Sequence, residues 1–247
     1  MATILGIDVG GTGIKAALVD TETGELLSDR HRIRTPAEST PKNVAAAVRQ
    51  LVAEFDYSGT IGCCFPAVVI DGRAKTAGNI DKAWRNTQID AAFEQATGLP
   101  FVVRNDADAA GIAEMQLGAG VGLGGMVIMI TIGTGLGSGV FYNGQLIPNI
   151  ELGRMPGKDG EPIEFYAGNR ARKVHDLSWD EWGLRFNYFL ERVARVFSPD
   201  HFIIGGGASK SFSKYEGAIR VPTTMHVARF RNNAGIIGAA VAAGQTN

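Results

Sequence analysis

The sequence predicts an α/β protein made of two lobes, and three observations lead to this prediction. Each half of the chain begins with an apolar run of strand length, at residues 3–9 and 126–132. Each run ends in a glycine-containing turn, which further strands and helices follow. The 33 glycines, about twice the usual share, gather in clusters between apolar runs. This alternation is typical of α/β lobes that bind ligands at the ends of their strands.

We expect an N-terminal lobe at residues 1–106 and a larger C-terminal lobe at residues 107–247, with an active-site cleft between them. The first lobe opens with three predicted strands joined by short turns. Pro41 then begins a helix in which apolar residues recur at helical spacing. The predicted strands of this lobe are 3–9, 14–19, 25–33, 60–65 and 101–104, and its helices begin at residues 41 and 89.

The second lobe contains a long predicted helix that starts near Ser178 and ends before Pro199. Glu181 stands three residues after Ser178, as in a capping box. The other elements expected here are a helix through Glu114, strands at 126–132 and 202–204, and a helix of small residues at 233–243. We expect this last helix to pack back on the N-terminal lobe.

Composition excludes several classes of protein. The net charge of −1 gives no global field that would attract nucleic acid or an anionic membrane. The two cysteines, Cys63 and Cys64, are adjacent in an apolar run, which argues against a disulfide framework and against a cysteine-based zinc site. The sequence shows no signal peptide and no apolar stretch of membrane-spanning length. We therefore expect a cytoplasmic protein that interacts with neither nucleic acid nor membrane.

A glycine-rich turn follows the first strand and predicts a phosphate loop. Backbone N–H groups of glycines after a strand can surround phosphate oxygens, while a threonine hydroxyl and a lysine add further donors. Asp8, at the strand end, is a candidate for a hydrated Mg²⁺, which prefers one or two carboxylates together with phosphate oxygens. The sequence lacks the ending of a Walker A loop, and a plain hairpin turn remains the alternative. The candidate phosphate-binding residues here are Asp8, Gly10, Gly11, Thr12, Gly13 and Lys15.

Two similar turns lie in the second lobe. The strand at 126–132 runs into Gly133, Thr134 and Gly135, which we expect to hold donor phosphates. The strand at 202–204 runs into a glycine triplet, in which Gly206 and Gly207 would let a nucleotide or a phosphate chain lie against bare backbone.

Asp106 is the candidate acid–base residue. A sugar hydroxyl that attacks a phosphoryl group needs a carboxylate within hydrogen-bond reach to accept its proton. Asp106 and Asp108 lie at a strand-to-helix junction but are two residues apart, so they do not face the same way on a helix. Asn105 can donate to and accept from sugar hydroxyls. From the residues alone, a role of Asp106 as helix N-cap is an equal alternative.

Taken together, these residues resemble the ROK family (repressors, open reading frames and sugar kinases). The run from Asp8 to Lys15, the pair Asn105–Asp106 and the loop Gly133–Gly135 carry this resemblance. It is closer to one branch of the family, the polyphosphate glucokinases, and covers nearly the whole chain. The segments similar to that branch are 65–69, 79–84, 105–111, 177–179, 197–199, 203–207 and 231–236.

The resemblance implies an actin-like, hexokinase-type fold and a glucokinase activity. The implied reaction transfers a phosphoryl group from polyphosphate, ATP or both to the 6-hydroxyl of glucose or a related hexose, with Mg²⁺ as cofactor. Asp106 becomes the general base, and a homodimer is expected. No structural zinc is expected, because the cysteines that hold zinc in many members are absent. The sugar-binding residues implied are Asn79, Asn105, Asp106, Glu151, Arg154 and Glu164.

One position departs from the family motif. Where the family has Glu-x-Gly-His, this chain has Arg154. Arginine is longer, always charged and only a donor. It can contact the sugar, pair with Glu151 or Glu164, or block the pocket. The departure leaves the preferred hexose open, and it motivates the alternative of a weakened sugar-binding or regulatory protein.

Two further interpretations carry less weight. The basic run Arg30, His31, Arg32 and Arg34 is typical of a solvated face, with guidance of a phosphate chain as the alternative. A sugar-responsive transcription regulator of the same fold would carry an N-terminal helix-turn-helix. We do not expect one here, because the phosphate loop begins at Asp8.

Overall fold

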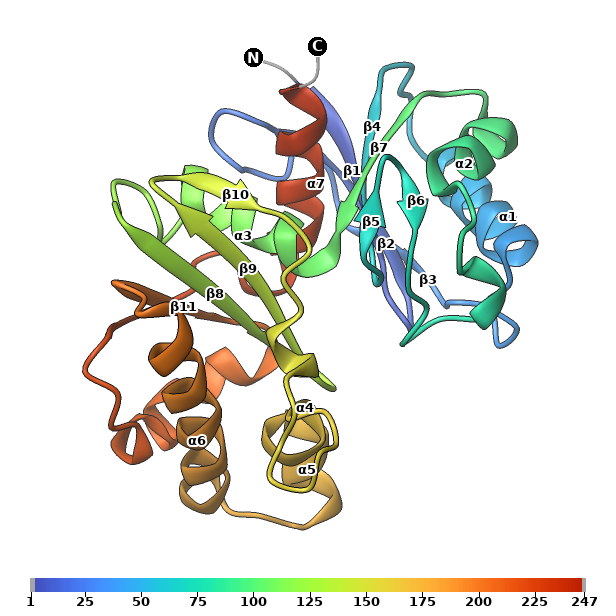
Figure 1. Ribbon diagram of the computed structural model, residues 1–247. Helices are drawn as coiled ribbons and strands as arrows, with labels where there is room; N and C mark the ends of the chain where they lie inside the picture. The colour runs from blue at the N-terminus through green and yellow to red at the C-terminus, as the bar shows by residue number, and fades with distance from the viewer. Residues whose placement is uncertain (1–2, 246–247) are drawn as a thin grey trace. The chain divides into compact units, whose positions relative to one another are not determined.

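The computed structural model describes residues 3–245 and divides them into two compact units (Figure 1). Unit 1 comprises residues 3–113 together with 233–245, and unit 2 comprises residues 114–232. The first two thirds of the helix that begins at Asp106 therefore group with unit 1, as does the C-terminal helix. None of the helices in the described part of the chain is long and apolar enough to cross a membrane.

A five-stranded sheet forms the centre of unit 1, in the order β3-β2-β1-β4-β7. The first three strands pair antiparallel, whereas β1, β4 and β7 run parallel. The carboxyl ends of these three parallel strands therefore share one edge of the sheet. The strands are β1 (Thr3–Val9), β2 (Ile14–Asp20), β3 (His31–Ile33), β4 (Ile61–Phe65) and β7 (Phe101–Asn105).

Helices cover both faces of this sheet (Figure 1). On one face, α1 (Pro41–Val52) and α2 (Ile89–Thr97) pack on alternate strand residues such as Leu5, Ile7 and Val9. Residues between them, such as Gly6 and Asp8, point to the other face because side chains alternate along a strand. There α7 (Ala234–Gly244) lies on β1 and β4.

Glycine permits the close approach of α7 to the sheet. A Cβ atom added to Gly62 of β4 would lie 2.0 Å from the carbonyl oxygen of Ala239, which is closer than any real contact. A Cβ on Gly238 would lie 1.6 Å from the carbonyl oxygen of Ala109 in α3 (Asp106–Leu117). These contacts fix α7 against both β4 and the helix that carries Asp106.

Unit 2 is built on a second five-stranded sheet of the same design, in the order β10-β9-β8-β11-β12. Three strands again pair antiparallel and two add in parallel, although the two halves show no close sequence repeat. The strands are β8 (Met126–Ile132), β9 (Leu136–Tyr142), β10 (Gln145–Ile147), β11 (His201–Gly205) and β12 (Thr224–Val227).

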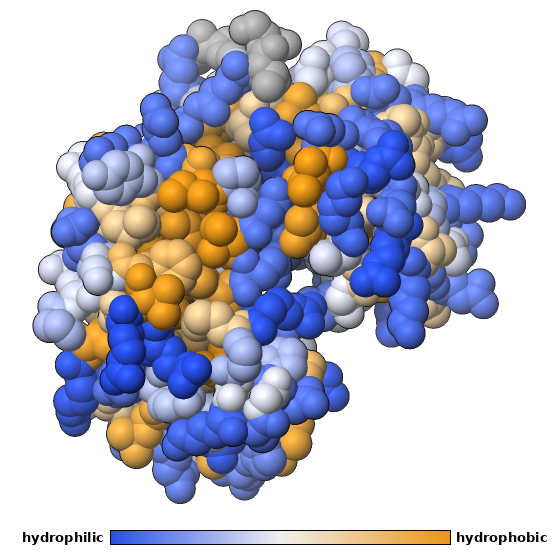
Figure 2. All heavy atoms as spheres, in the orientation of Figure 1, coloured by the Kyte–Doolittle hydropathy of each residue, from blue (hydrophilic) through white to orange (hydrophobic). Residues whose placement is uncertain are grey.

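The core of unit 2 lies between this sheet and α6 (Trp179–Phe197). Trp182 and Phe186 of α6 are fully buried, and the indole Nε1 of Trp182 donates to the carbonyl oxygen of Ala167, 3.0 Å away. The predicted capping box of α6 is present, with Ser178 as N-cap. Apolar side chains also gather over β9 and β10 on the face seen in Figure 2.

Smaller elements connect these layers. The two helices α4 and α5 precede α6, and a short hairpin, β5 with β6, follows β4. Five 3₁₀ helices are also found in the described residues. The bounds are β5 (Val69–Ile70), β6 (Arg73–Ala74), α4 (Glu164–Ala167), α5 (Asn169–Val174), η1 (Lys82–Trp84), η2 (Leu152–Arg154), η3 (Gly207–Lys214), η4 (Glu216–Ala218) and η5 (Arg231–Asn233).

The predicted strand at 25–33 is wrong for its first two thirds, since only His31–Ile33 forms β3. Leu26 makes a single bridge to Val19. Beyond it, the backbone N–H of Leu18 donates to the hydroxyl of Ser28, 3.0 Å away, instead of to a carbonyl group. A side-chain acceptor thus interrupts the ladder. The strands β9, β10 and β12 and the hairpin were not predicted.

Candidate functional site

The carboxyl edge of the unit 1 sheet brings the first group of predicted residues together. Asp8 lies near the end of β1, and Asn105 ends β7. Between these two strands, β4 pairs Cys64 with Asp8 and Phe65 with Asn105. The parallel arrangement therefore places Asp8 and the start of α3 at the same edge of one sheet.

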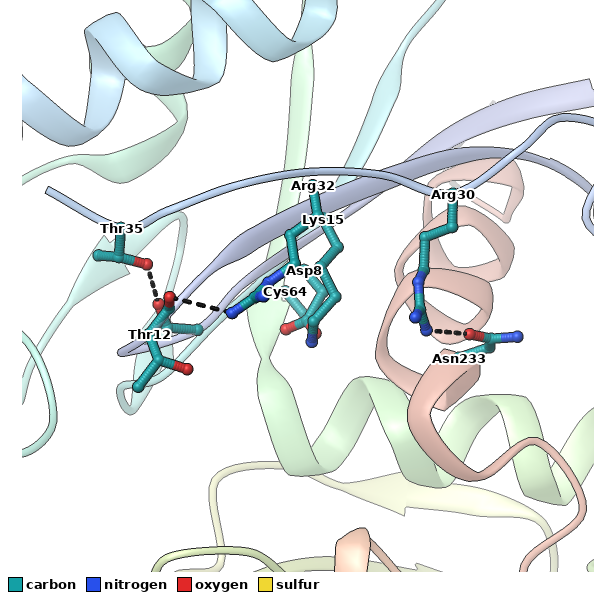
Figure 3. Close-up of polar contacts among 9 residues, drawn as sticks. Asp8, Thr12, Lys15, Arg30, Arg32, Thr35, Cys64 and Asn233 are labelled. Atoms are coloured by element: carbon teal, nitrogen blue, oxygen red, sulfur yellow. Dashed lines mark hydrogen bonds and ion pairs between the residues drawn. The ribbon is translucent and has the colours of Figure 1, made fainter.

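The phosphate loop is a tight turn between β1 and β2. The N–H of Gly10 donates to the carbonyl oxygen of Gly13, 3.1 Å away, and the hydroxyl of Thr35 donates to the carbonyl oxygen of Gly10 at 2.6 Å (Figure 3). A Cβ on Gly11 would lie 3.1 Å from the carbonyl oxygen of Asn79. The loop thus presents bare backbone, and the segment that contains Asn79 lies directly beside it.

Asp8 is held on both of its oxygens. Lys15 Nζ lies 2.7 Å from one carboxylate oxygen, and Cys64 Sγ lies 3.4 Å from the other, at donor distance for a thiol. A carboxylate has about four lone-pair sites, so these contacts leave capacity for a hydrated Mg²⁺ that is also bound by donor phosphates. No cluster of three metal-ligating side chains exists within residues 3–245. Asp8 therefore fits an Mg²⁺ ion bound through one carboxylate and fits no site made of protein ligands alone.

The helix N-cap of α3 is Asn105 rather than Asp106. The Oδ1 atom of Asn105 accepts from the N–H groups of Ala107 and Asp108 at 2.9 and 3.0 Å, and its Nδ2 donates to the carbonyl oxygen of Ala67 at 2.9 Å. Asn105 is only 4% exposed. Asp106 is the exposed first residue of the helix, where its Oδ1 accepts from the N–H of Ala107. Asn105 thus makes the capping hydrogen bonds that the alternative interpretation assigned to Asp106.

The thiols of Cys63 and Cys64 are fully buried. Burial raises the pKa of both, and the negative charge of Asp8 adds to the effect; Asp106 contributes a further rise for Cys64. The charges of Asp8 and Asp106 thus both act on the Cys64 thiol.

We expect both thiols to be unreactive in the folded protein. Only the thiolate is a nucleophile, and neither sulfur is accessible to solvent. Titration with 5,5′-dithiobis(2-nitrobenzoic acid) at pH 8 should detect no thiol before denaturation and two per chain in urea. Rapid reaction of one thiol in the native protein would contradict the burial of this pair.

In unit 2, Glu164 lies over the second glycine loop. Its Oε2 accepts from the N–H of Leu136 at 3.2 Å, and a Cβ on Gly135 would lie only 1.9 Å from that oxygen. Arg154 Nη1 lies 3.5 Å from the other oxygen, Oε1. Of the three possibilities open for Arg154, the structure shows pairing with Glu164. The arginine side chain is 46% exposed and that of the glutamate 13%.

Hydrogen bonds to the backbone of the residues before and after Glu151 hold it in position. The buried hydroxyl of Ser138 in β9 donates to the carbonyl oxygen of Ile150 and accepts from the N–H of Leu152. A Cβ on Gly153 would lie 2.2 Å from the carbonyl oxygen of Leu136. The glycine of the Glu-x-Gly motif is therefore needed for close approach to β9.

The third glycine cluster, at Gly206 and Gly207, lies against the strand that leads into the second cluster. Gly206 has a φ of +75°, and a Cβ there would lie 2.6 Å from the backbone nitrogen of Ile132, at the end of β8. Both the left-handed backbone and the close approach require glycine. Gly206 and Gly207 thus stand beside the strand that leads into Gly133.

The predicted site residues therefore form one group in each unit. Unit 1 holds the phosphate loop with Asp8 and Lys15, Asn79 beside the loop, and Asn105 with Asp106 at the same sheet edge. Unit 2 holds the two glycine turns and the three residues Glu151, Arg154 and Glu164. Sequence reasoning missed the supporting residues Thr35, Cys64 and Ser138, because nothing in their local sequence indicates which distant backbone or carboxylate they contact.

Comparison with known proteins identifies relatives along nearly the whole chain. The ROK family model matches residues 4–151. The polyphosphate glucokinase of Mycobacterium tuberculosis is 39% identical over 238 residues, which cover 96% of this chain and 89% of that protein. The crystal structure of the inorganic polyphosphate/ATP-glucomannokinase from Arthrobacter sp. strain KM matches with a TM-score of 0.96 at 42% identity, and the match covers 100% of both chains.

A second solved structure, the ROK family glucokinase of Streptomyces griseus in complex with glucose and AMPPNP, has a TM-score of 0.86 and 27% identity. It covers 99% of this chain and 100% of that one. The fold is thus the predicted actin-like, hexokinase-type α/β fold. On the family match and on the identity to these relatives, the chain belongs to the ROK family.

Proposed function

We propose that this protein is a glucokinase that transfers a phosphoryl group from inorganic polyphosphate or ATP to the 6-hydroxyl of glucose. The relatives named above are a polyphosphate glucokinase and a polyphosphate/ATP-glucomannokinase, similar over nearly their full length. The residues that such a reaction needs are present in this chain and are grouped at strand ends. This grouping supports the catalytic function over that of a sugar-binding or regulatory protein.

The observation that carries the proposal is the placement of Asp106. It is the exposed first residue of α3, while Asn105 satisfies the helix N-terminus in its place. Asp8 and the phosphate loop lie at the same sheet edge. A carboxylate that is not needed as the cap, near a loop suited to phosphates, is suited to accept a proton from an attacking hydroxyl.

In the proposed reaction, the O6–H proton of glucose passes to the Asp106 carboxylate as O6 forms a bond to the terminal phosphorus. The bond between that phosphorus and its bridging oxygen breaks, and the leaving group is ADP or a polyphosphate shortened by one phosphate. Catalysis then rests mainly on positioning and on stabilisation of charge, as in other phosphoryl transfers.

The donor phosphates would be bound by the backbone N–H groups of residues 10–13, by the Thr12 hydroxyl and by Lys15. Gly133–Gly135 and Gly206–Gly207 would contribute the same kind of backbone from unit 2. Mg²⁺ would be held through Asp8, where it would neutralise charge on the phosphate oxygens. Removal of Mg²⁺ with a chelator is expected to abolish turnover.

Asn79, Glu151, Arg154 and Glu164 are the proposed sugar-binding residues. The two glutamates offer acceptors for hydroxyl groups and Arg154 offers donors. Asn105 is also a candidate, although its hydrogen bonds described above are made to backbone. We assign it the added role of holding the start of α3, and with it Asp106, in position.

The proposal is tested by comparing donors and sugars under one set of conditions. The purified chain with Mg²⁺ is given long-chain polyphosphate or ATP together with glucose, mannose or another hexose, and the sugar phosphate is quantified. We expect glucose 6-phosphate with at least one donor. Binding of hexose without turnover on any donor would instead support the weakened sugar-binding protein.

Arg154→Ala is expected to raise the KM for glucose by about three- to tenfold with little change in kcat, which is the effect of losing one hydrogen bond to an uncharged partner. Its partly exposed ion pair with Glu164 adds little to stability. Arg154→His should keep more of the affinity. Steady-state kinetics with glucose and mannose measure both effects, with Arg170→Ala as the control. An unchanged KM in Arg154→Ala would remove this residue from the sugar site.

We also propose a cytoplasmic homodimer. Two reduced, buried cysteines suit a reducing compartment. Apolar side chains are exposed on α4, α5 and α6 of unit 2, namely Phe165, Tyr166, Val174 and Leu184. Exposed apolar side chains of this size are suited to self-association. Sedimentation equilibrium would show a dimer if this is correct and a monomer at all concentrations if it is not.

A further inference from the structure

Four strands of unit 1 align a row of chemically active side chains across the sheet. In the strand register, Asp8 of β1 pairs with Lys15 of β2, and Lys15 pairs with Arg32 of β3. On its other side, Asp8 pairs with Cys64 of β4. Directly paired residues present their side chains on the same face. The row Arg32–Lys15–Asp8–Cys64 therefore lies on one face of the sheet, as Figure 3 shows.

Charge is not balanced along this row. Lys15 and Asp8 neutralise each other through their 2.7 Å contact. Among residues 3–245, Arg32 contacts no carboxylate: its Nη2 donates to the carbonyl oxygen of Thr12, 3.3 Å away, in the phosphate loop. Arg30 points to the same side of the sheet and donates through Nη1 to the amide oxygen of Asn233 at 2.8 Å (Figure 3). Two exposed guanidinium groups thus lie on this face of the sheet, that of Arg32 at the loop and that of Arg30 beside Asn233.

The loop is shaped to receive Arg32. A Cβ on Gly13 would lie 2.5 Å from Arg32 Nε, so the guanidinium lies against bare backbone at the position where a side chain would otherwise stand. A guanidinium carries five N–H donors in a planar fork. With one of them engaged by Thr12, Arg32 has donors left for phosphate oxygens, and the same holds for Arg30 with Asn233. Bidentate binding of phosphate is the interaction for which arginine is best suited.

We propose that Arg32 and Arg30 form a subsite for the distal phosphates of an inorganic polyphosphate chain, whose end is held by the phosphate loop and Lys15. This inference rests on the proposed kinase function. ATP ends in a nucleoside after three phosphates, whereas polyphosphate continues as a polyanion. A pair of cations two residues apart, Arg32 in β3 and Arg30 just before it, therefore adds more to the binding of polyphosphate than to that of ATP.

The test is the double substitution Arg30→Gln with Arg32→Gln, which removes both charges and keeps polar side chains. Loss of two charged hydrogen-bond donors is expected to raise the KM for long-chain polyphosphate by about tenfold or more. The KM for ATP should rise less. Arg49→Gln is the matched control, because Arg49 is exposed on α1, which packs on the opposite face of the same sheet. It should leave both KM values near those of the unaltered chain.

Salt dependence supplies a second readout. Binding of a polyanion by exposed cations weakens as salt concentration rises. The KM for polyphosphate should therefore rise with KCl in the unaltered chain and rise less steeply in the double variant. Equal increases of the KM for ATP and polyphosphate in the double variant, or an unchanged KM for polyphosphate, would overturn the subsite.

Failure of the subsite and failure of the kinase proposal give different results. A chain that phosphorylates glucose with polyphosphate, but whose KM is insensitive to the two arginines, retains its function and loses only the subsite. Turnover with ATP and none with polyphosphate would also overturn the proposed subsite. If no donor supports turnover, equilibrium binding of fluorescently labelled polyphosphate to the unaltered chain and the double variant still decides the inference. Equal affinity for the two proteins would refute it.

Discussion

Asp106→Asn is expected to lower kcat for glucose phosphorylation by about 10²- to 10⁴-fold, the usual contribution of a general acid–base residue. The amide is nearly isosteric with the carboxylate but cannot accept the hydroxyl proton. Asn105 still caps α3 through the N–H groups of Ala107 and Asp108, so the helix should not change. Isothermal titration calorimetry should therefore show glucose binding within a few-fold of normal.

The control for this experiment is Asp71→Asn. Asp71 is exposed in the hairpin of β5 and β6 and has a φ of +48°, a conformation that asparagine tolerates as well as aspartate. This substitution removes one carboxylate from the same unit and should leave kcat unchanged. If Asp106→Asn retained near-normal kcat, Asp106 would not be the base. If it lost glucose binding and turnover equally, Asp106 would be a sugar-binding residue instead.

Glu114→Ala is expected to produce the largest loss of stability, about 3–5 kcal/mol in the free energy of unfolding. Glu114 is fully buried, and its carboxylate accepts from the N–H groups of Ala119, Arg229 and Phe230 at 2.9, 3.0 and 2.7 Å. Removal of the carboxylate leaves these three donors without an acceptor. Glu114→Gln should be intermediate, because an amide offers one acceptor oxygen where the carboxylate offers two.

Urea denaturation measures this effect, with Glu161→Ala as the control because Glu161 is exposed in the same unit. That control should change the free energy of unfolding by less than about 0.5 kcal/mol. Glu114 also ties together the two segments at which the chain passes between units, near residues 114 and 232. A loss below about 1 kcal/mol in Glu114→Ala would show that water replaces the carboxylate at these donors.

Much of the fold could be predicted because β1, β4, β8 and β11 are short apolar runs with glycine or proline at or directly after their ends. The strand at 126–132 and the capping box at Ser178 are examples in which the local signal is complete. β9 was missed because in its sequence, Leu-Gly-Ser-Gly-Val-Phe-Tyr, three small residues follow the first leucine and show no alternation of apolar and polar side chains. The stretch 25–30 was over-predicted because the hydroxyl of Ser28 interrupts the ladder, which composition does not reveal.

The candidate site residues were identified by type, but their relations depend on the fold. The sequence could not distinguish Asp106 from Asn105 as the cap of α3, and the hydrogen bonds of Asn105 make that distinction. It left open whether Arg154 contacts the sugar, pairs with Glu151 or Glu164, or blocks the pocket, and the geometry shows the pair with Glu164. It treated the basic run at Arg30 and Arg32 as a solvated face, because only strand register reveals that Lys15, Arg32 and Asp8 form one row.

The division into lobes at residue 106 and the cleft stay predictions. Activity measurements test the catalytic and binding roles. The contacts of the described residues group the beginning of α3 and all of α7 with the first unit. In this arrangement Asp106 and the phosphate loop belong to one body, which suits a base that must stay aligned with the phosphorus.

The most direct test of the central claim is the identity of the product formed by the purified chain with Mg²⁺, glucose and a phosphoryl donor. Phosphorus and carbon NMR of the reaction mixture report both the transfer and the oxygen that is phosphorylated. The account predicts glucose 6-phosphate, formed at the expense of polyphosphate or ATP and absent with Asp106→Asn. A mixture in which glucose stays unmodified with either donor, or in which Asp106→Asn forms the product equally fast, would contradict it.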